Sequence, residues 1–405
     1  MSISTAVSRV FITLCMIFSL TACNYINNLA DWWKSSSTTT TAADTSETHK
    51  VDKAGKKGAD KGDNKADSKA DKAEKPKKAK ATGEIAPVSF AVGGSYAQWM
   101  PWFLANEEGT YQQFAQEYKV DIKFVTDSYQ DTIKKYLDGE VDAVAVTNID
   151  AIAQLVKHDI ESDVIMITGY SNGSDALLLP ADASSDIHGK SLAAVQFSSR
   201  HYLLDRYLMR NQIGFDEVNI SSVSETDIPS AFGNGQVYGV AAGNPNVDKL
   251  VREQKAKVLF DSREVPKEIS DLIVVRRETL QDHPGFAKAL LATWFSVMER
   301  LQGNRRGPTL DKMAGLANLS REDYDRQLTM VTLNDTPTKA LSAIRDRAMR
   351  KSMRYIRYFI ERHNLTGSEA FTGWVSYPGR TPALLHYNAQ PLQNFVAPPL
   401  DIEAQ

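Results

Sequence analysis

The chain has 405 residues, with 47 Lys+Arg against 50 Asp+Glu and a formal net charge of −3, so no strongly basic surface points to a nucleic-acid partner. Its two cysteines, Cys15 and Cys23, both lie near the amino terminus, which excludes disulfides, cysteine metal sites and thiol nucleophiles from the rest of the chain. The remaining length is sufficient for two lobes of ordinary size.

Residues 1–22 are predicted to form a secretory signal, because Arg9 precedes an apolar run from Val10 to Leu20 that is too short to span a bilayer. The sequence Leu20-Thr21-Ala22-Cys23 resembles a bacterial lipobox. That resemblance implies cleavage before Cys23, a lipid on its side chain, and an envelope protein that faces the periplasm. Asn24 follows the cysteine, which favours the outer membrane in a host that has two membranes.

Residues 23–83 are predicted to be a disordered basic tether. Between Lys50 and Lys80 the chain carries twelve lysines and six acidic residues, with almost no aromatic or branched side chain. Such a composition cannot bury enough apolar surface to fold. We expect a solvated spacer, with contact to anionic lipid or cell wall as the alternative.

The next region alternates strand-like and helix-like patterns, which predicts βαβ units and a parallel sheet. The first strand ends just before Trp99 and Trp102, which places both indoles where ligands bind in open α/β sheets. They suit a planar or cationic solute, and burial in the core is the alternative. Strands are predicted at 88–92, 121–125, 142–146 and 164–168, with helices at 103–118, 128–138 and 149–158.

A second series of the same kind predicts a second lobe. Its strands are expected at 191–195, 218–220, 238–241 and 257–260, with helices at 199–212, 227–232 and 246–254. Extended apolar runs at 175–180 and 270–275 are typical of crossovers between lobes. Helices at 278–301, 310–317, 321–330 and 338–363 are predicted to return to the first lobe, and 367–405 to form an ordered but irregular wrap.

The predicted fold is therefore α/β, with two lobes, two crossovers and mainly parallel sheets. The first lobe is expected to comprise 84–174 and 275–405, and the second lobe 175–274.

Gly169-Tyr170-Ser171-Asn172-Gly173 matches the G-x-S-x-G pattern of a hydrolase nucleophile. A nucleophile elbow must lead into a helix, whereas an extended apolar run begins here at Asp175. A turn at a lobe hinge is the preferred interpretation, and a serine hydrolase that uses Ser171 stays a minor alternative. The seven histidines show no HxxxH or HExxH spacing, so neither a metal nor a cofactor is expected.

Ser198 and Ser199 open the predicted helix at 199–212, with His201 in its first turn. Backbone amides and hydroxyl groups at such a helix start can hold a carboxylate or a sulfonate. Simple capping of the helix by either serine is the alternative.

Several of these segments together resemble the solute-binding proteins of ABC importers in the nitrate, sulfonate, taurine and thiamine-precursor group. They are Asp142 to Asp150, Ser171 to Ala176, Ser198 to Leu204 and Asn244-Pro245. Trp99 to Trp102, Thr147-Asn148 and Ser171 to Gly173 look closest to the branch associated with urea carboxylase. The resemblance implies a type II periplasmic-binding fold that closes on its ligand by hinge bending.

The same resemblance implies a set of ligand-binding residues and one departure. The usual tryptophan before Asn-Pro is replaced by Gly243, which opens one wall of the expected cleft. The implied residues are Trp99, Trp102, Asn148, Asp150, Ser171, Asn172, Asp175, Ser198, Ser199, His201, Tyr202 and Asn244.

The expected function is capture of a small polar solute, urea- or guanidine-like or else sulfonate- or nitrate-like, and its delivery to an ABC permease, without catalysis. A binding-protein fold that has lost tight solute binding and acts as a structural or regulatory envelope protein is the alternative.

Overall fold

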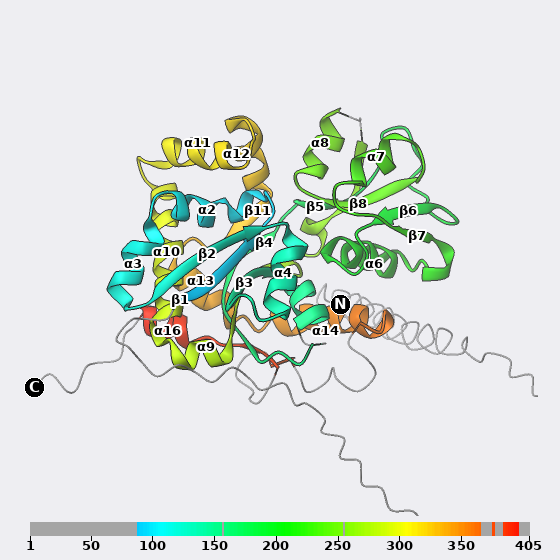
Figure 1. Cartoon of the computed structure of the whole chain (residues 1–405). Coiled ribbons are helices and arrows are strands. Elements are labelled where there is room, and N and C mark those ends of the chain that lie inside the picture. The colour runs from blue at the N-terminus through cyan, green and yellow to red at the C-terminus, as the bar shows by residue number, and fades with distance from the viewer. Residues whose placement is uncertain (1–86, 156–157, 254–255, 366–374, 377–383, 397–405) are drawn as a thin grey trace, which may run out of the picture. The chain divides into compact units, whose positions relative to one another are not determined.

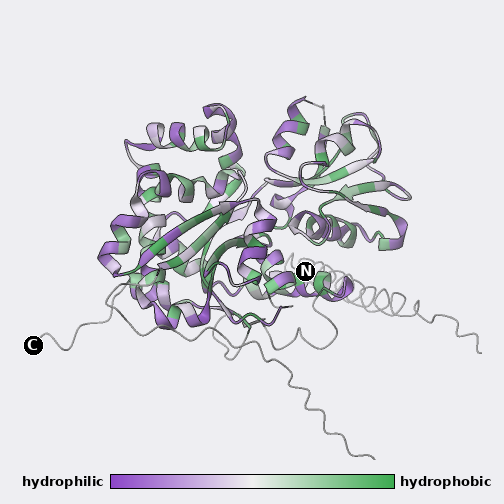
Figure 2. Ribbon diagram, viewed as in Figure 1, coloured by the Kyte–Doolittle hydropathy of each residue, from purple (hydrophilic) through white to green (hydrophobic). Residues whose placement is uncertain are grey.

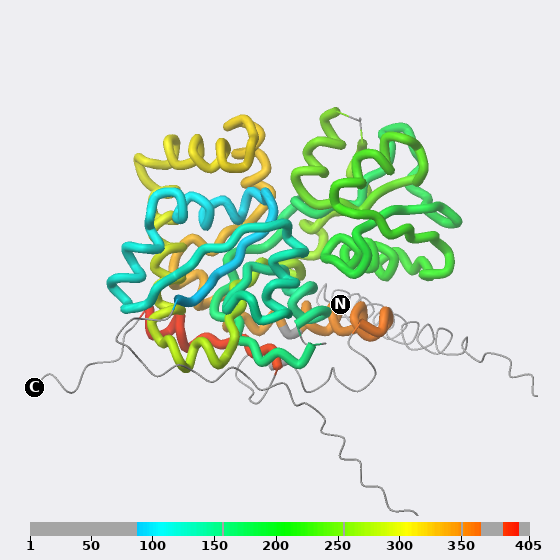
Figure 3. Tube along the Cα trace, viewed as in Figure 1, coloured from blue at the N-terminus to red at the C-terminus, as the bar shows by residue number. Residues whose placement is uncertain are grey.

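The computed structural model describes residues 87–155, 158–253, 256–365, 375–376 and 384–396, all within one compact unit that spans residues 79–405 (Figures 1 and 3). The predicted signal, Cys23, the tether and much of the predicted wrap lie outside the described residues. Within the described ranges, every helix is too short or too polar to cross a membrane.

The first sheet contains eight strands among the described residues, in the order β12-β13-β4-β10-β3-β1-β2, with β11 paired to β4. Its central strands β3 and β4 are buried along their whole length, as expected for strands covered on both faces. The strands are β1 (Pro87–Gly93), β2 (Asp121–Asp127), β3 (Ala143–Thr147), β4 (Ser162–Ser171), β10 (Ser270–Arg276), β11 (Val331–Leu333), β12 (Val375–Ser376) and β13 (Leu385–Tyr387).

Among the described residues, the second sheet has five strands in the order β7-β6-β8-β5-β9. The chain enters it between β4 and β5 and leaves it between β9 and β10. The strands are β5 (Asp175–Pro180), β6 (Ser191–Ala194), β7 (Asn219–Ser222), β8 (Gly239–Gly243) and β9 (Ala256–Asp261). The α/β architecture with two sheets and two crossings, predicted from the alternating patterns, is confirmed.

One detail of the second crossing differs from the sequence prediction. The predicted second lobe extends to residue 274 and so includes most of the run at 270–275. In the structure this run forms β10, a buried central strand of the first sheet. A continuous apolar run is typical of a strand covered on both faces, and sequence alone does not say which sheet it joins.

The two sheets are mixed. The expected parallel pairs are present, such as β1 with β2 and with β3, and β6 with β7 and with β8. Antiparallel pairs join them, because β10 runs against β3 and β4, and β5 runs against β8 and β9. Each of these crossing strands enters its sheet from the edge at which the neighbouring parallel strands end.

The helices around the first sheet are shorter than the periodicity predicts. The predicted helix 103–118 divides at Gly109, whose φ of +71° is left-handed, and 278–301 divides at His283-Pro284 because proline cannot continue a helix. These helices are α2 (Met100–Glu107), α3 (Thr110–Tyr118), α4 (Tyr129–Leu137), α5 (Asn148–Asp150), α9 (Arg277–Asp282), α10 (Pro284–Gln302), α11 (Arg306–Leu316), α12 (Arg321–Thr329), α13 (Pro337–Ile344) and α16 (Gln390–Val396).

The second sheet is accompanied by α6 (Ser199–Asn211), α7 (Ile228–Gly233) and α8 (Asn246–Glu253). The predicted helix 338–363 divides into α13 and α14 (Met349–Arg362), and these two helices pack differently. Whereas α13 and α16 contact β4 of the first sheet, α14 contacts α6 beside the second sheet (Figure 1). Figure 2 shows the apolar strands enclosed by helices whose outer faces are polar.

Candidate functional site

Polar and aromatic side chains gather where strands of the two sheets end. Ligands of open α/β sheets bind beyond the carboxyl ends of parallel strands, so this position is the natural candidate for a site. The group, called the inter-sheet cluster below, consists of Tyr96, Trp99, Tyr129, Asp150, Asp175, Arg200, Glu225 and Asp271.

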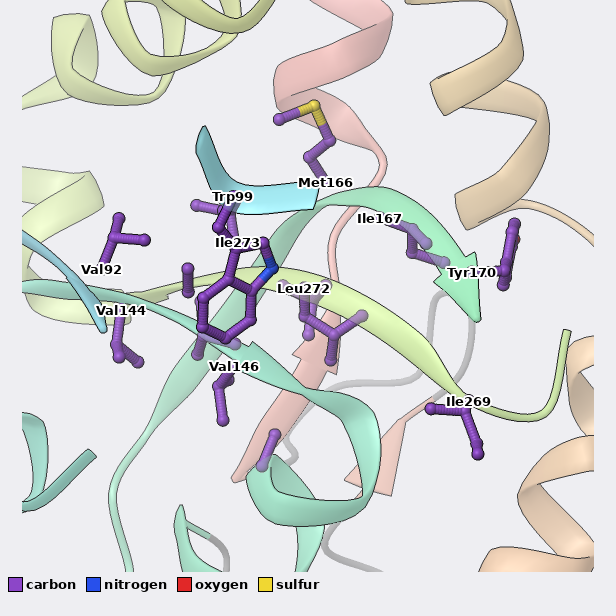
Figure 4. Close-up of a cluster of buried hydrophobic side chains, with 14 of the residues drawn as sticks. Val92, Trp99, Val144, Val146, Met166, Ile167, Tyr170, Ile269, Leu272 and Ile273 are labelled. Atoms are coloured by element: carbon purple, nitrogen blue, oxygen red, sulfur yellow. The ribbon is translucent and has the colours of Figure 1, made fainter. Parts of the chain in front are cut away.

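Three aromatic rings form the part of the cluster nearest the first sheet. The ring centroid of Tyr96 lies 5.5 Å from that of Trp99 and 5.9 Å from that of Tyr129, and Trp99 lies 5.3 Å from Tyr129. Trp99 is 1% exposed, and Figure 4 shows its indole in a buried cluster with Val144 and Val146. The Trp99 ring is therefore buried behind Tyr96. Of the three rings, that of Tyr96 is the most accessible to solvent.

Asp150 is the last residue of α5, which follows β3, and is buried. Its Oδ2 accepts hydrogen bonds from the hydroxyl of Tyr129 at 2.8 Å and from that of Thr147 at 2.7 Å. Burial raises the pKa of the Asp150 carboxyl, and these bonds together with the charge of Arg200 oppose that rise. The carboxyl is thus fixed in orientation by two neutral donors.

Asp271, near the start of β10, is another buried carboxyl of the cluster. Burial and the nearby charge of Asp175 raise its pKa to about 7, although Gln98, Arg200 and Trp99 act in the opposite direction. A carboxyl whose pKa lies near neutrality changes its charge readily when a cation arrives or departs.

Arg200 carries the positive charge of the cluster from the first turn of α6. Its Nε lies 3.2 Å from Oδ1 of Asp175 and 3.8 Å from Oε2 of Glu225, and its Nη1 donates to the Ser199 hydroxyl at 3.0 Å. The guanidinium carbon lies 5.5 Å from the ring centroid of Tyr96. Burial acts to lower the pKa of Arg200, but the charges of Glu225 and Asp175 raise it well above its ordinary value.

Carboxyl groups outnumber cations in this cluster by four to one, since Asp150, Asp175, Glu225 and Asp271 surround the single guanidinium of Arg200. A site with an excess of acceptors beside aromatic faces suits a cation or a planar group rich in N–H donors. Within the described ranges, His, Cys, Asp and Glu side chains form no group of three that could hold a metal ion.

The structure brings three of the residues predicted from sequence into the cluster: Trp99, Asp150 and Asp175. Ser199 lies at its edge through the bond to Arg200. Ser198 caps α6, because its hydroxyl accepts from the backbone N–H of Arg200 at 3.2 Å. That contact is the capping role considered as the alternative for the serine pair.

Trp102 lies outside the cluster. Its indole is fully buried beneath α10 and packs against Phe90 at 5.0 Å and Trp294 at 5.1 Å between ring centroids. This is the core position considered as the alternative for the two tryptophans. Trp99 precedes α2, whereas Trp102 lies within it, so the two indoles leave the chain in different directions.

Asn148 and Tyr202 both hold the segment that leads into β10. Nδ2 of Asn148 donates to the backbone carbonyl of Glu268 at 2.9 Å, and the Tyr202 hydroxyl donates to Oε2 of Glu268 at 2.6 Å. Arg206 completes this anchor, with Nε and Nη2 at 2.7 and 3.0 Å from the two carboxylate oxygens of Glu268. These contacts are structural and lie beside the second crossing.

His201 faces α14. Its ring centroid lies 5.2 Å from that of Phe359 and 4.6 Å from that of His363, and its Nδ1 accepts from the backbone N–H of Phe197. Burial lowers the pKa of His201 to about 3, with further lowering by the charges of His363 and Arg362. Successive residues of a helix point about 100° apart, so Arg200 and His201 face different neighbours.

Ser171 and Asn172 lie at the first crossing. The Ser171 hydroxyl donates to that of Ser262 at 2.7 Å, contacts Ser174 at 2.8 Å and accepts from the Asp175 backbone at 3.2 Å, which fills its hydrogen-bonding capacity. Strand β5 follows where a nucleophile elbow requires a helix, so the geometry of an elbow is not formed. Asn172 is exposed.

Asn244 begins a cis peptide bond to Pro245, and its side-chain oxygen accepts from the backbone N–H of Asp248 at 3.1 Å. Gly243 precedes it at the end of β8 and pairs with Asp175 of β5. A Cβ atom on Gly243 would lie 2.4 Å from Nη2 of Arg200, so the guanidinium lies directly against this glycine.

Sequence reasoning missed several members of the cluster. Arg200 stands inside the Ser198–Leu204 stretch, and a basic residue in the first turn of a helix, where the helix dipole disfavours positive charge, is a signal that could have identified it. The other missed members, Tyr96, Tyr129, Glu225 and Asp271, lie on separate elements and carry no local pattern.

Two cavities occur elsewhere in the described part of the chain. One, of about 560 Å³, lies between α6 and β9 near Tyr207 and Phe260, and the other, of about 440 Å³, lies between α3 and α10 near Phe114 and Phe295. Neither is lined by a residue of the inter-sheet cluster.

Comparison with protein families gives a match between residues 83–316, more than half of the chain, and the model described as the NMT1-like family. Comparison with curated protein sequences gives no match.

Solved structures of binding proteins share the fold. The alkanesulfonate-binding protein SsuA from Xanthomonas axonopodis pv. citri, bound to MOPS, is 17% identical with a TM-score of 0.56, covering 70% of this chain and 96% of that protein. The periplasmic aliphatic sulphonate binding protein SsuA from Escherichia coli is 16% identical with a TM-score of 0.58, covering 70% and 94%. A Candida albicans protein described as having the generic periplasmic binding protein fold is 13% identical, with a TM-score of 0.53, covering 71% and 97%. At these identities the likeness shows the fold, which is that of type II periplasmic binding proteins.

Proposed function

The chain belongs to the NMT1-like family, and from that premise we propose that it is the solute-binding component of an ABC importer. The type II periplasmic-binding fold supports this role. The position of the inter-sheet cluster, beyond strand ends in both sheets, supports it as the solute site. No catalytic step is assigned to the protein, whose task is to capture a small polar solute and deliver it to a permease.

The chemistry of the cluster favours a urea- or guanidine-like solute over a sulfonate- or nitrate-like one. The observation that carries this choice is the group of carboxyls, above all the buried Asp150 and Asp271, beside the rings of Tyr96 and Trp99. A permanent anion would meet like charges that burial leaves poorly screened. A planar solute with many N–H groups would stack on the Tyr96 ring and donate to the carboxyls.

A screen of melting temperature tests this proposal. Urea, guanidine, taurine and nitrate are added in turn to the wild type and to Asp150→Asn and Asp163→Asn. Asp163 is the matched control, a buried carboxyl on β4 that pairs with Arg277 and Asn388 away from the cluster. We expect urea or guanidine to raise the melting temperature of the wild type and of Asp163→Asn, and to lose that effect in Asp150→Asn. A rise with taurine or nitrate alone would contradict the assigned solute class.

We further propose that a lipid on Cys23 holds the protein in the cell envelope, facing the periplasm, with the outer membrane favoured where two membranes exist. The lipobox-like sequence Leu20-Thr21-Ala22-Cys23 supports this location. Cys23→Ser should move the full chain from the membrane fraction to the soluble fraction and abolish incorporation of labelled palmitate. Unchanged membrane association and labelling in that variant would refute the anchor.

A second candidate function is a structural or regulatory envelope protein that keeps the fold without tight solute binding. The observation in its favour is that Arg200 lies against Gly243 and pairs with Asp175 inside the cluster, which leaves less room for a solute. The absence of any rise in melting temperature across the screen would support this alternative.

A further inference from the structure

The side chain of Arg200 is placed where its own helix disfavours it. It stands in the first turn of α6, at the end where the helix dipole is positive, and it is buried. The cost of a buried cation at this position must be offset by the contacts that the side chain reaches. Those contacts are the carboxylates of Asp175 and Glu225 and the ring of Tyr96.

Gly243 provides the space for that guanidinium. A Cβ atom here would lie 2.4 Å from Nη2 and 2.6 Å from Nε of Arg200, closer than real Cβ atoms come to other atoms. Gly243 is not among the glycines with positive φ, so backbone freedom does not explain it. The absence of a side chain at Gly243 therefore leaves room for the guanidinium, which lies against β8 beside the strand position that pairs with Asp175.

The guanidinium of Arg200 makes fewer aligned hydrogen bonds to carboxylates than that of Arg206, a neighbouring arginine of the same helix. Arg206 makes two aligned hydrogen bonds to Glu268 and lies 3.6 Å from the ring centroid of Tyr355. Nε of Arg200 is buried within 3.2 Å of a carboxylate oxygen of Asp175 yet is not aligned for a hydrogen bond with it. The Nε–H group of Arg200 is thus buried without an aligned hydrogen-bond acceptor.

These contacts are the ones that a guanidinium-type solute would make, namely an aromatic face, two carboxylates and a helix-start hydroxyl. We propose that the guanidinium of Arg200 is an internal occupant of the solute site, and that a planar, N–H-rich cation must displace it to bind. This inference rests on the proposed function in taking the inter-sheet cluster as the solute site. The apparent affinity of the wild type is then reduced by the small fraction of molecules in which Arg200 has moved aside.

Calorimetric titration of the full chain with methylguanidinium at millimolar concentration tests the proposal. Arg200→Ala removes the occupant and should bind methylguanidinium about tenfold or more tightly than the wild type does. Arg200→Lys, which keeps the charge but lacks the planar fork, should show an intermediate affinity and guards against misfolding of the alanine variant. Methylammonium at the same ionic strength is the control for a non-planar cation and should show no such gain.

Arg206→Ala is the matched control variant, because it removes an equally buried arginine from the same helix with the same kinds of partner. We expect no gain in affinity there. Equal gains in Arg200→Ala and Arg206→Ala would mean that methylguanidinium merely fills an arginine-shaped hole, and would overturn the proposal.

Equal binding by the wild type and Arg200→Ala, or weaker binding by Arg200→Ala, would overturn the competition between Arg200 and solute while leaving the proposed transport function intact. A lack of response to methylguanidinium in all of these variants, together with a negative solute screen of the wild type, would overturn both.

Discussion

Replacement of Asp271 by asparagine should change how the stability of the protein depends on pH. The pKa of this carboxyl is raised from 3.8 to about 7 in the folded chain, so the folded state keeps a proton that the unfolded state has lost. Stability from this group is present at low pH and declines as the pH rises towards 7. At 1.36 kcal/mol per pKa unit, the decline between pH 5 and pH 8 is about 3 kcal/mol.

Asparagine resembles the protonated carboxyl in shape and does not titrate, so Asp271→Asn should lack this decline. The free energy of unfolding is measured by urea denaturation of both proteins at pH 5 and pH 8. We expect the variant to gain about 3 kcal/mol relative to the wild type between these two values. Asp163→Asn is the control, because the pKa of Asp163 is lowered and this carboxyl stays ionised over this range.

A difference between wild type and Asp271→Asn that stays constant from pH 5 to pH 8 would refute the reasoning. It would mean that Asp271 ionises normally in the folded chain and that the site is better hydrated than its burial indicates. A positive result has a consequence for solute binding: a cation that favours the ionised carboxyl should bind more tightly as the pH rises through 7, with release of a proton.

Three further predictions concern packing, ion pairing and protonation. Gly243→Ala should lower the free energy of unfolding by about 2–4 kcal/mol in the wild type, because the new methyl group forces Arg200 out of a buried ion pair. The cost should be much smaller in an Arg200→Ala background. Equal costs in both backgrounds would contradict the contact between residue 243 and the guanidinium. Arg326→Ala should cost about 2 kcal/mol in urea denaturation, because its two bonds to the buried carboxylate of Asp248, at 2.7 and 3.0 Å, join α12 to α8. The pKa of His201 falls from 6.5 to about 3 on folding, so between pH 7 and pH 5 only the unfolded chain takes up a proton on this ring. The free energy of unfolding should therefore drop by about 2 kcal/mol over that range. His201→Phe should remove this part of the drop, and an unchanged drop would contradict a buried neutral ring.

Most strands and helices followed from periodicity, because the spacing of apolar residues records which faces of an element are covered. Periodicity carries less information about where a helix ends. The break at Gly109 depends on a left-handed backbone and the break at His283-Pro284 on a missing N–H, whereas the short strand β11 exists only because β4 offers it a partner. The direction of β5 and β10 likewise depends on which sheet each one enters.

For the candidate site, the end of the first predicted strand pointed to Trp99, because ligands of α/β folds bind beyond such ends, whereas Asp150 and Asp175 were implied by the family resemblance. Tertiary packing decided which neighbouring side chains joined them. Trp102 turned into the core against Trp294, and His201 turned towards α14.

The sequence by itself determined the α/β class, the two crossings and the residue types available at the strand ends. Only the tertiary structure decided which residues surround Arg200. This residue belongs to α6 beside the second sheet, yet its guanidinium lies over the ring of Tyr96 and its charge acts on Asp150, and both of these residues follow strands of the first sheet. The physical reason is that burial and charge pairing depend on distances between elements far apart in the chain. A glycine such as Gly243 reveals its role only when the atoms that would collide with its Cβ are in place.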